Sequence, residues 1–214
     1  MTTRALTPAE ISLLSTALAQ QDRHRDRLFL LIAVTTGFRV SELLTLKFAQ
    51  LTGADGQIAR DVTITRRLLK GGHGYRAKAI RSRRVPLSAT ARTAISEYLA
   101  TLAVHPARET YVFRSRKGEN LPITRGQAHH IMKTLAFATG LDATRVGCHS
   151  TRKAYAKGLY AASGNDLIKT QRIMGHSNPL TTARYLDTCE KELDELVMNF
   201  DPMGLRAPAL AACV

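Results

Sequence analysis

The sequence predicts an α+β fold that is mainly α-helical and contains a small antiparallel β-sheet. Most of the chain carries apolar residues at helical spacing, and several of these runs begin at capping residues. Residues 58–87 instead show the two-residue alternation of strands on either side of a glycine-rich turn. With 214 residues, no internal repeat and no low-complexity linker, the chain is expected to form one compact domain.

Three features predict the helices of the first third of the chain. Thr7-Pro8-Ala9-Glu10 has the form of a capping box, so a helix should begin there. Residues 28–35 are nearly all apolar and precede Gly37, which indicates a buried helix that ends just before Arg39. Another helical run follows, with apolar residues at Val40, Leu43, Leu44 and Leu46.

The sheet is predicted within residues 58–87. Val62 and Ile64 alternate with polar residues, and a turn region follows at Gly71-Gly72-His73-Gly74. A basic segment then closes on Val85-Pro86-Leu87. This order of strand, turn and strand is typical of an antiparallel pair.

Helices dominate the rest of the chain. Ser88 is a predicted N-cap for a helix through Leu102, and Tyr111–Phe113 is a predicted short strand before a basic turn. Residues 201–214 are expected to form a loose apolar tail. The remaining predicted helices span Arg125–Thr139, His149–Ser163, Asp166–Met174 (ended by Gly175) and Pro179–Phe200 (capped by Asn178).

The charge of the chain points to a polyanionic partner. The 31 Lys and Arg against 17 Asp and Glu give a formal charge of +14. These charges are unevenly spread, because residues 60–84 hold nine Lys or Arg and a single acidic residue, Asp61. A generally basic, solvated surface is the alternative, but the uneven distribution favours nucleic acid.

Several classes of site are excluded. No stretch approaches the roughly 20 apolar residues of a membrane span, and residues 1–20 lack the features of a signal peptide, so we expect a cytoplasmic protein without a membrane partner. Cys148, Cys189 and Cys213 are odd in number and far apart, which fits a reducing compartment. Zinc-binding, nucleotide-binding and serine-hydrolase motifs are all missing, so no metal and no cofactor are expected.

Breaking a phosphodiester bond without water or metal requires a nucleophile, cations around the developing charge and an acid for the departing 5′ oxygen. His149 and Arg152 lie at i and i+3, on one face of a predicted helix. Arg152 offers a planar fork of donors to phosphate oxygens, and His149 exchanges a proton near neutral pH. By themselves, two such residues are more typical of a solvated helix surface.

Other candidates lie elsewhere in the chain. His176 follows Gly175 at a predicted helix end, and Tyr185 lies nine residues later on the next helix. Taken singly, they indicate a capping histidine and a core tyrosine. Arg39 begins a helix with Glu42 one turn away, which by itself indicates a structural ion pair.

Together these residues resemble the tyrosine recombinases, or phage integrase family. The likeness extends from about Leu6 to Glu195, with the motifs in family order. It implies the catalytic fold of DNA breaking and rejoining enzymes over residues 6–200, and chemistry independent of metal and ATP. The residues that carry it are Arg39 in Gly-Phe-Arg-Val-Ser-Glu-Leu, Lys78 eight residues before Pro86, His149-x-x-Arg152, Gly175-His176 and Tyr185.

The resemblance also implies a part for each of these residues. Arg39 and Arg152 clamp the scissile phosphate, and His176 stabilises the transition state. His149 assists proton transfer, and Tyr185 attacks to form a 3′-phosphotyrosine.

The general acid is implied to be Lys78, which protonates the 5′ oxygen. The predicted hairpin is rich in basic residues, so Lys70 and Arg76 remain alternatives for this place. Counting back from Pro86 favours Lys78.

Two further expectations concern the organisation of the chain before and after the catalytic residues. Many relatives begin with a separate helical domain, whereas this sequence enters the catalytic region almost at once. We therefore expect no separate N-terminal core-binding domain, as in the small recombinases that invert fimbrial promoter switches; a truncated chain is the alternative. After the nucleophile, an apolar stripe docks either on a neighbouring protomer or within its own chain, and it comprises Leu193, Leu196, Val197 and Phe200.

The expected function is site-specific DNA recombination: integration, excision, resolution or inversion. The partners implied by the resemblance are double-stranded DNA with specific sites, further copies of the chain in a tetramer on that DNA, and accessory DNA-bending proteins. Type IB topoisomerase-like relaxation and an inactive DNA-binding regulator are the alternatives.

Overall fold

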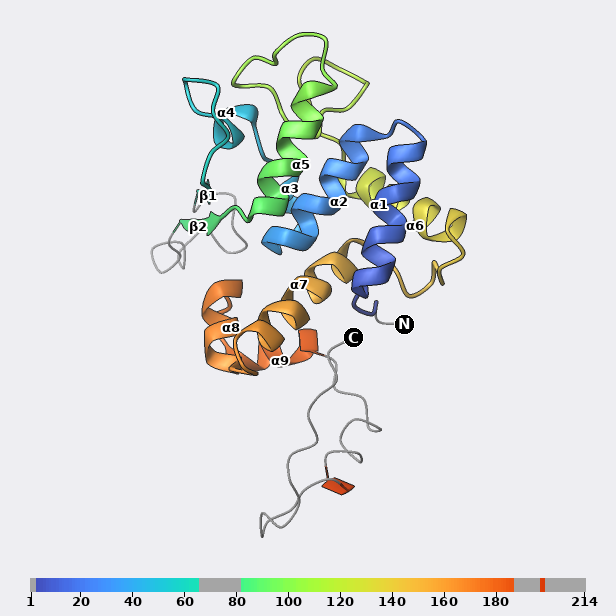
Figure 1. Cartoon of the computed structure of the whole chain (residues 1–214), viewed down its shortest axis with the longest axis vertical. Coiled ribbons are helices and arrows are strands. Elements are labelled where there is room, and N and C mark those ends of the chain that lie inside the picture. The colour runs from blue at the N-terminus through green and yellow to red at the C-terminus, as the bar shows by residue number, and fades with distance from the viewer. Residues whose placement is uncertain (1–2, 66–81, 187–196, 199–214) are drawn as a thin grey trace.

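The computed structural model describes residues 3–65, 82–186 and 197–198. Helices dominate it, and two strands pair into one small antiparallel sheet, which confirms the predicted fold class (Figure 1). In this part of the chain no helix is long and apolar enough to cross a membrane. The elements in chain order are α1 (Pro8–Gln20), α2 (His24–Thr36), α3 (Val40–Leu43), α4 (Phe48–Leu51), β1 (Asp61–Ile64), β2 (Arg83–Pro86), α5 (Ala89–Ala100), α6 (Arg125–Ala138), α7 (Cys148–Ala162), α8 (Leu167–Met174) and α9 (Pro179–Leu186).

Helix α2 lies at the centre of the fold. It packs against α1, α5 and α7, and Leu28, Leu30 and Ile32 on it are buried. The predicted run 28–35 is therefore the core-facing part of a helix that begins one turn earlier. Gly37 ends this helix in the left-handed conformation, with φ of 61°, as the sequence predicts.

Side-chain caps mark the starts of α1, α5, α6 and α8. Thr7 Oγ1 accepts a hydrogen bond from the Glu10 backbone N–H (3.2 Å), and Glu10 Oε2 accepts one from the Thr7 backbone N–H (2.9 Å), which confirms the capping box. Ser88 caps α5 in the same way, with Oγ 3.2 Å from the Ala91 backbone nitrogen. These oxygens satisfy backbone donors that have no partner within the helix.

The sheet consists of β1 and β2. Asp61 pairs with Pro86 and Ile64 pairs with Arg83, so the strands run antiparallel. Val62 and Ile64 face the core together with Val85. The predicted turn region between the strands lies outside the described residues.

The predicted strand at Tyr111–Phe113 is wrong. Tyr111 makes one isolated bridge with Lys47, and Val112 donates to the Leu46 carbonyl oxygen at 2.9 Å. Val112 and Phe113 are buried, so the apolar pattern reflects core packing in an irregular segment.

Helices α7, α8 and α9 form a second group, drawn in orange in Figure 1. They pack on one another, and α7 also packs against α2. Asp166 Oδ1 caps α8 by accepting from the Lys169 backbone N–H (2.8 Å), and Gly175 ends it with φ of 66°. The predicted continuation of α9 to Phe200, and its stripe at Leu193, Leu196 and Phe200, lie outside the described residues; Val197 is described and is exposed.

Candidate active site

The site begins where α2 gives way to α3. Gly37 turns the chain, and Arg39 becomes the residue that precedes the first turn of α3. Glu42, fully buried on that turn, accepts from the Arg39 backbone N–H (2.9 Å) and from Nη1 (2.8 Å). The Arg39 side chain keeps 26% of its surface exposed. One buried carboxylate therefore orients a cation that still faces solvent.

Arg152 joins the ends of two helices. It comes from α7 and is 99% buried, with 1% of its surface exposed. Nη1 donates to the Gly37 carbonyl oxygen, and Nη2 donates to that of Met174 at 3.2 Å. Both carbonyls lie at helix C-termini, where oxygens lack partners and the helix dipole is negative. Burial, followed by the charge of Arg39, lowers the pKa of Arg152 to about 10, so the guanidinium remains charged at neutral pH.

His176 is held between Arg152 and α9. Its Nε2 lies 2.7 Å from Arg152 Nη2, and its Nδ1 lies 2.9 Å from Thr182 Oγ1. Because arginine only donates, Nε2 must accept, and the ring proton is therefore assigned to Nδ1, which donates to Thr182. Burial and the charges of Arg152, Arg39 and Arg83 lower the pKa of His176 to about 4. The imidazole is thus neutral at neutral pH.

Tyr185 lies on α9, one helical turn after Thr182, and is half-buried. The centre of its ring is 5.3 Å from that of His176 and 5.5 Å from the Arg152 guanidinium carbon. The phenol therefore contacts both groups from a third element, which places a nucleophile candidate directly beside two cation or proton-donor candidates.

His149 stands at the first turn of α7 and is exposed. Partial burial, and then the charges of Arg152, Lys153 and Arg39, lower its pKa. A neutral imidazole near the cations is suited to accept a proton. Of the predicted site residues, the structure thus brings together Arg39, His149, Arg152, His176 and Tyr185, whereas Lys78 and its alternatives Lys70 and Arg76 lie outside the described residues.

Sequence reasoning missed Arg83 on β2. Its side chain is only 11% exposed and lies 3.9 Å from Glu42, and its charge lowers the pKa of His176. A signal for it existed, because strand residues two apart face the same side and Arg83 shares its side with the buried Val85.

The composition of the cluster fits an anion and gives a metal no ligand set. Three arginines approach one another around a single carboxylate, Glu42. Within residues 3–65 and 82–186, no group of three or more His, Cys, Asp or Glu is placed to hold a metal ion. This excess of positive charge favours a phosphate as the bound group.

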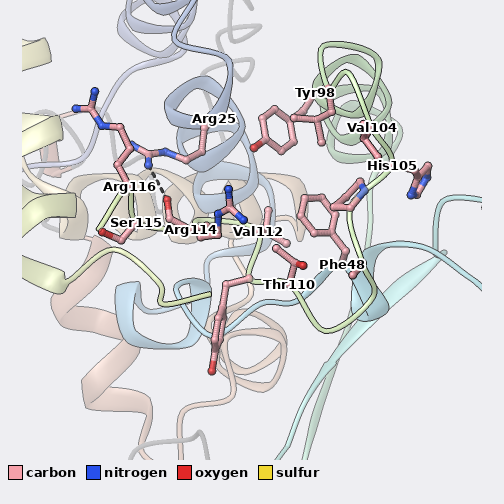
Figure 2. A pocket seen from close by; sticks show the side chains of 14 residues that line it. Arg25, Phe48, Tyr98, Val104, His105, Thr110, Val112, Arg114, Ser115 and Arg116 are labelled. Atoms are coloured by element: carbon pink, nitrogen blue, oxygen red, sulfur yellow. Dashed lines mark hydrogen bonds between the residues drawn. The ribbon is translucent and has the colours of Figure 1, made fainter. Parts of the chain in front are cut away.

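A separate pocket of about 520 Å³ lies near Tyr98, Val104 and Arg114 (Figure 2). Arg25 reaches into this region and donates from Nη1 to the Arg114 carbonyl oxygen at 2.8 Å. None of the residues that line it belongs to the cluster around Arg152, so the pocket is distinct from the candidate active site.

Comparison with known proteins gives a family match over most of the chain. The model of the phage integrase family matches residues 4–192. The tyrosine recombinase XerD of Bradyrhizobium diazoefficiens is 34% identical over 186 residues, which cover 83% of this chain and 54% of that protein. XerD of Rhizobium meliloti is 32% identical over 80% of this chain and 50% of its own length. The chain therefore spans about half the length of these relatives.

Solved structures share the fold. The crystal structure of XerA recombinase superposes with a TM-score of 0.68 at 20% identity, covering 92% of this chain and 63% of that one. XerH site-specific recombinase bound to the palindromic difH substrate, in a post-cleavage complex, gives 0.66 at 24% identity, covering 91% of this chain and 52% of that one.

Proposed function

Because the chain belongs to the phage integrase family, we propose that it is a site-specific recombinase that cleaves and rejoins DNA through a 3′-phosphotyrosine intermediate. Double-stranded DNA carrying specific sites is the substrate, and further copies of the chain, as a tetramer, assemble on it. The net charge of +14 supports a DNA partner. The complex of XerH with difH and the lambda integrase dimer bound to a COC′ core site support it by analogy.

The observation that carries the proposal is the contact of Tyr185 with His176 and Arg152. The phenol ring lies 5.3 Å from the imidazole and 5.5 Å from the guanidinium carbon, although these residues come from different elements. Arg39, oriented by Glu42, adds a second guanidinium that faces solvent. A phosphate bound here would meet the nucleophile and the cations at once.

In the proposed reaction, the Tyr185 oxygen forms a bond to phosphorus while the bond from phosphorus to the 5′ oxygen breaks. Ionising an ordinary phenol at neutral pH costs about 4 kcal/mol. His149 accepts the phenol proton as the bond to phosphorus forms. Lys78 is proposed to protonate the departing 5′ oxygen. The broken bond's energy is kept in the phosphotyrosine, so resealing by a 5′ hydroxyl needs no ATP.

His176 must change its hydrogen bonds for its part in this reaction. In the structure its Nε2 accepts from Arg152 and therefore carries no proton to offer a phosphate. A bound phosphate would attract Arg152 and favour the protonated imidazole, since an adjacent anion raises the pKa of a base. His176 would then donate from Nε2 to a phosphate oxygen.

Covalent trapping tests the proposal. Nicked duplexes that carry randomised sequence, together with DNA flanking the encoding gene, are incubated with the protein and separated on a denaturing gel. A nick near the cleavage site releases a short fragment, so the adduct accumulates. We expect a protein–DNA adduct with the native chain, none with Tyr185→Phe, and an undiminished amount with the control Tyr160→Phe, which removes a phenol from α7 outside the cluster.

Two outcomes would count against the proposal. An adduct formed by Tyr185→Phe would reject Tyr185 as nucleophile. Specific DNA binding without any adduct from the native chain would favour a DNA-binding regulator. Once the trapped sequence is known, supercoiled DNA carrying one or two copies of it is incubated with the protein. Relaxation of both DNAs without exchange would indicate a type IB topoisomerase, and exchange between the two copies would indicate a recombinase.

A further inference from the structure

Strand β2 places two neighbouring arginines in opposite environments. The Arg84 side chain is 68% exposed and pairs with Asp61 across the sheet at 2.6 Å. Arg83 points the other way, into the molecule, and is 11% exposed. Successive residues of a strand face opposite sides of the sheet, so Arg84 is a natural control for experiments on Arg83.

Arg83 binds the same two helix ends that Arg152 binds. Its Nη2 donates to the Ile173 carbonyl oxygen at 3.2 Å, in the last turn of α8, and to that of Thr36 at 3.4 Å, the last residue of α2. Arg152 reaches the neighbouring carbonyls from α7. Two guanidinium groups from two elements thus hold the end of α8 against the end of α2.

Arg83 also adjoins the groups beside these helix ends. Nη1 lies 3.9 Å from Glu42, the carboxylate that orients Arg39. Its aliphatic stem lies against Gly175, because a Cβ atom on that glycine would come within 3.2 Å of Arg83 Cδ. The residue that follows Gly175 is His176. One side chain therefore lies beside Gly175, which precedes His176, and beside Glu42, which orients Arg39.

Burying the Arg83 guanidinium costs desolvation free energy that a side chain with only a packing role would not incur. Its Nε and Nη1 are buried without a hydrogen-bond partner among the described residues. Its guanidinium lies over the Phe38 ring at 5.7 Å, a contact that an apolar side chain would make without the desolvation cost. The nitrogens of Arg152 are covered too, but Arg152 lies over the ring of Tyr185, the proposed nucleophile, whereas Arg83 lies over Phe38. We therefore assign the contact with the phosphate to Arg152 and not to Arg83.

We propose that Arg83 is a positioning residue for the cleavage reaction: it fixes Gly175-His176 through the end of α8, and Arg39 through Glu42. This inference rests on the proposed function of the site. Arg83 acts through His176 and Arg39 and makes no contact with DNA.

Single-turnover cleavage of trapped DNA tests this assignment. Arg83→Met keeps the stem over Phe38 and removes the hydrogen bonds and the charge. At saturating DNA we expect its rate of adduct formation to fall on the order of 100-fold, as for small displacements of reacting groups, with DNA affinity little changed. Arg84→Met is the matched control and should cleave at the native rate. Native-rate cleavage by Arg83→Met would overturn the assignment.

A second variant, Arg83→Lys, tests whether slow cleavage by Arg83→Met results only from misfolding. It keeps the charge but offers one ammonium group where the guanidinium spans two carbonyls and approaches Glu42, so we expect partial recovery of the rate. Recovery equal to the native rate would show that charge alone matters and would overturn positioning through the helix ends. A fall in DNA affinity without a fall in the rate at saturating DNA would do the same.

A measurement on the DNA-free protein separates this inference from the proposed function. The Arg83 charge lowers the pKa of His176, so Arg83→Met should raise the midpoint of the His176 titration seen by NMR, whereas Arg84→Met should leave it at about 4. An unchanged midpoint in Arg83→Met contradicts the link to His176 even if the native chain forms no adduct. Absence of an adduct with a shifted midpoint instead counts against the proposed function alone.

Discussion

At the scale of single residues, the site depends on groups whose partners fix their charge or orientation. His176 is the clearest case, because Arg152 occupies Nε2 and Thr182 accepts from Nδ1. The neutral ring is therefore a consequence of its hydrogen bonds as well as of its burial. Protonation of His176 would break the contact with Arg152, since both groups would then be donors.

The lowered pKa of His176 predicts a pH-dependent stability. An ordinary imidazole has a pKa of 6.5, and that of His176 is about 4, so between these values the unfolded chain binds more protons. The stabilisation is complete above pH 6.5 and is lost as the pH falls towards 4. Between about pH 7 and pH 5 we expect the native chain to lose on the order of 1 kcal/mol more stability than His176→Gln. Equal losses in urea unfolding would contradict the neutral, buried ring.

Thr182 is predicted to position His176. Thr182→Val removes the acceptor of the Nδ1 proton and leaves a buried donor unsatisfied, which should cost roughly 1–3 kcal/mol of unfolding free energy. Adduct formation should slow, with DNA affinity unchanged, because the imidazole loses its orientation. The exposed neighbour Thr181→Val is the control and should change neither quantity. A similar loss in both variants in urea unfolding would point to helix propensity as the cause.

Much of the cluster followed from the family resemblance. The structure gathers Arg39, His149, Arg152, His176 and Tyr185 as that resemblance implies, while the catalytic roles of these residues remain predictions. Arg83 was missed because it is one of nine Lys or Arg within residues 60–84, and its two-residue spacing from Val85, which marks it as inward-facing, was not weighed against that general basic character.

At the scale of secondary structure, two helix ends shape the site. α2 and α8 both end in a left-handed glycine, Gly37 and Gly175, and both expose carbonyl oxygens to arginines. Gly37 is additionally covered by the Tyr155 ring, which leaves no room for a Cβ atom. These glycines allow the chain to turn and the arginines to approach closely.

Gly175→Ala is predicted to impair cleavage beyond its cost in stability. Its φ of 66° disfavours a side chain by roughly 1–2 kcal/mol, and the new Cβ would press on Arg83 at 3.2 Å. Gly164→Ala is the matched control, because it has φ of 71° and open space around it. We expect similar losses in thermal stability and a much slower adduct formation only in Gly175→Ala. Equal cleavage rates would show that the contact with Arg83 is unimportant.

Element prediction succeeded where local signals agreed with packing. The capping box of α1, the Ser88 cap of α5 and the two terminal glycines all mark helix ends in the structure. Tyr111–Phe113 failed because burial in the core produces the same apolar pattern as a strand when the backbone pairs at isolated positions only.

At the scale of the whole molecule, the two groups of helices meet at the candidate active site. The group around α2 supplies Arg39, and the group of α7, α8 and α9 supplies Arg152, His176 and Tyr185. Arg152 of α7 binds the Gly37 carbonyl oxygen at the end of α2, and Arg83 of β2 binds the Ile173 carbonyl oxygen of α8. Local periodicity does not predict long-range packing of this kind. The sequence therefore predicted the residues of the candidate site better than the contacts with helix ends that hold them in place.

The most direct test of the account is to identify the residue that carries DNA in a trapped adduct. Digestion of the adduct with trypsin and a nuclease, followed by mass spectrometry, is expected to find the nucleotide on Tyr185, in the peptide that follows Arg184 and ends at Lys191. Tyr155, a second phenol near Arg152 among the described residues, should be unmodified. A nucleotide on Tyr155, or on any residue other than Tyr185, would contradict the proposed arrangement of nucleophile and cations.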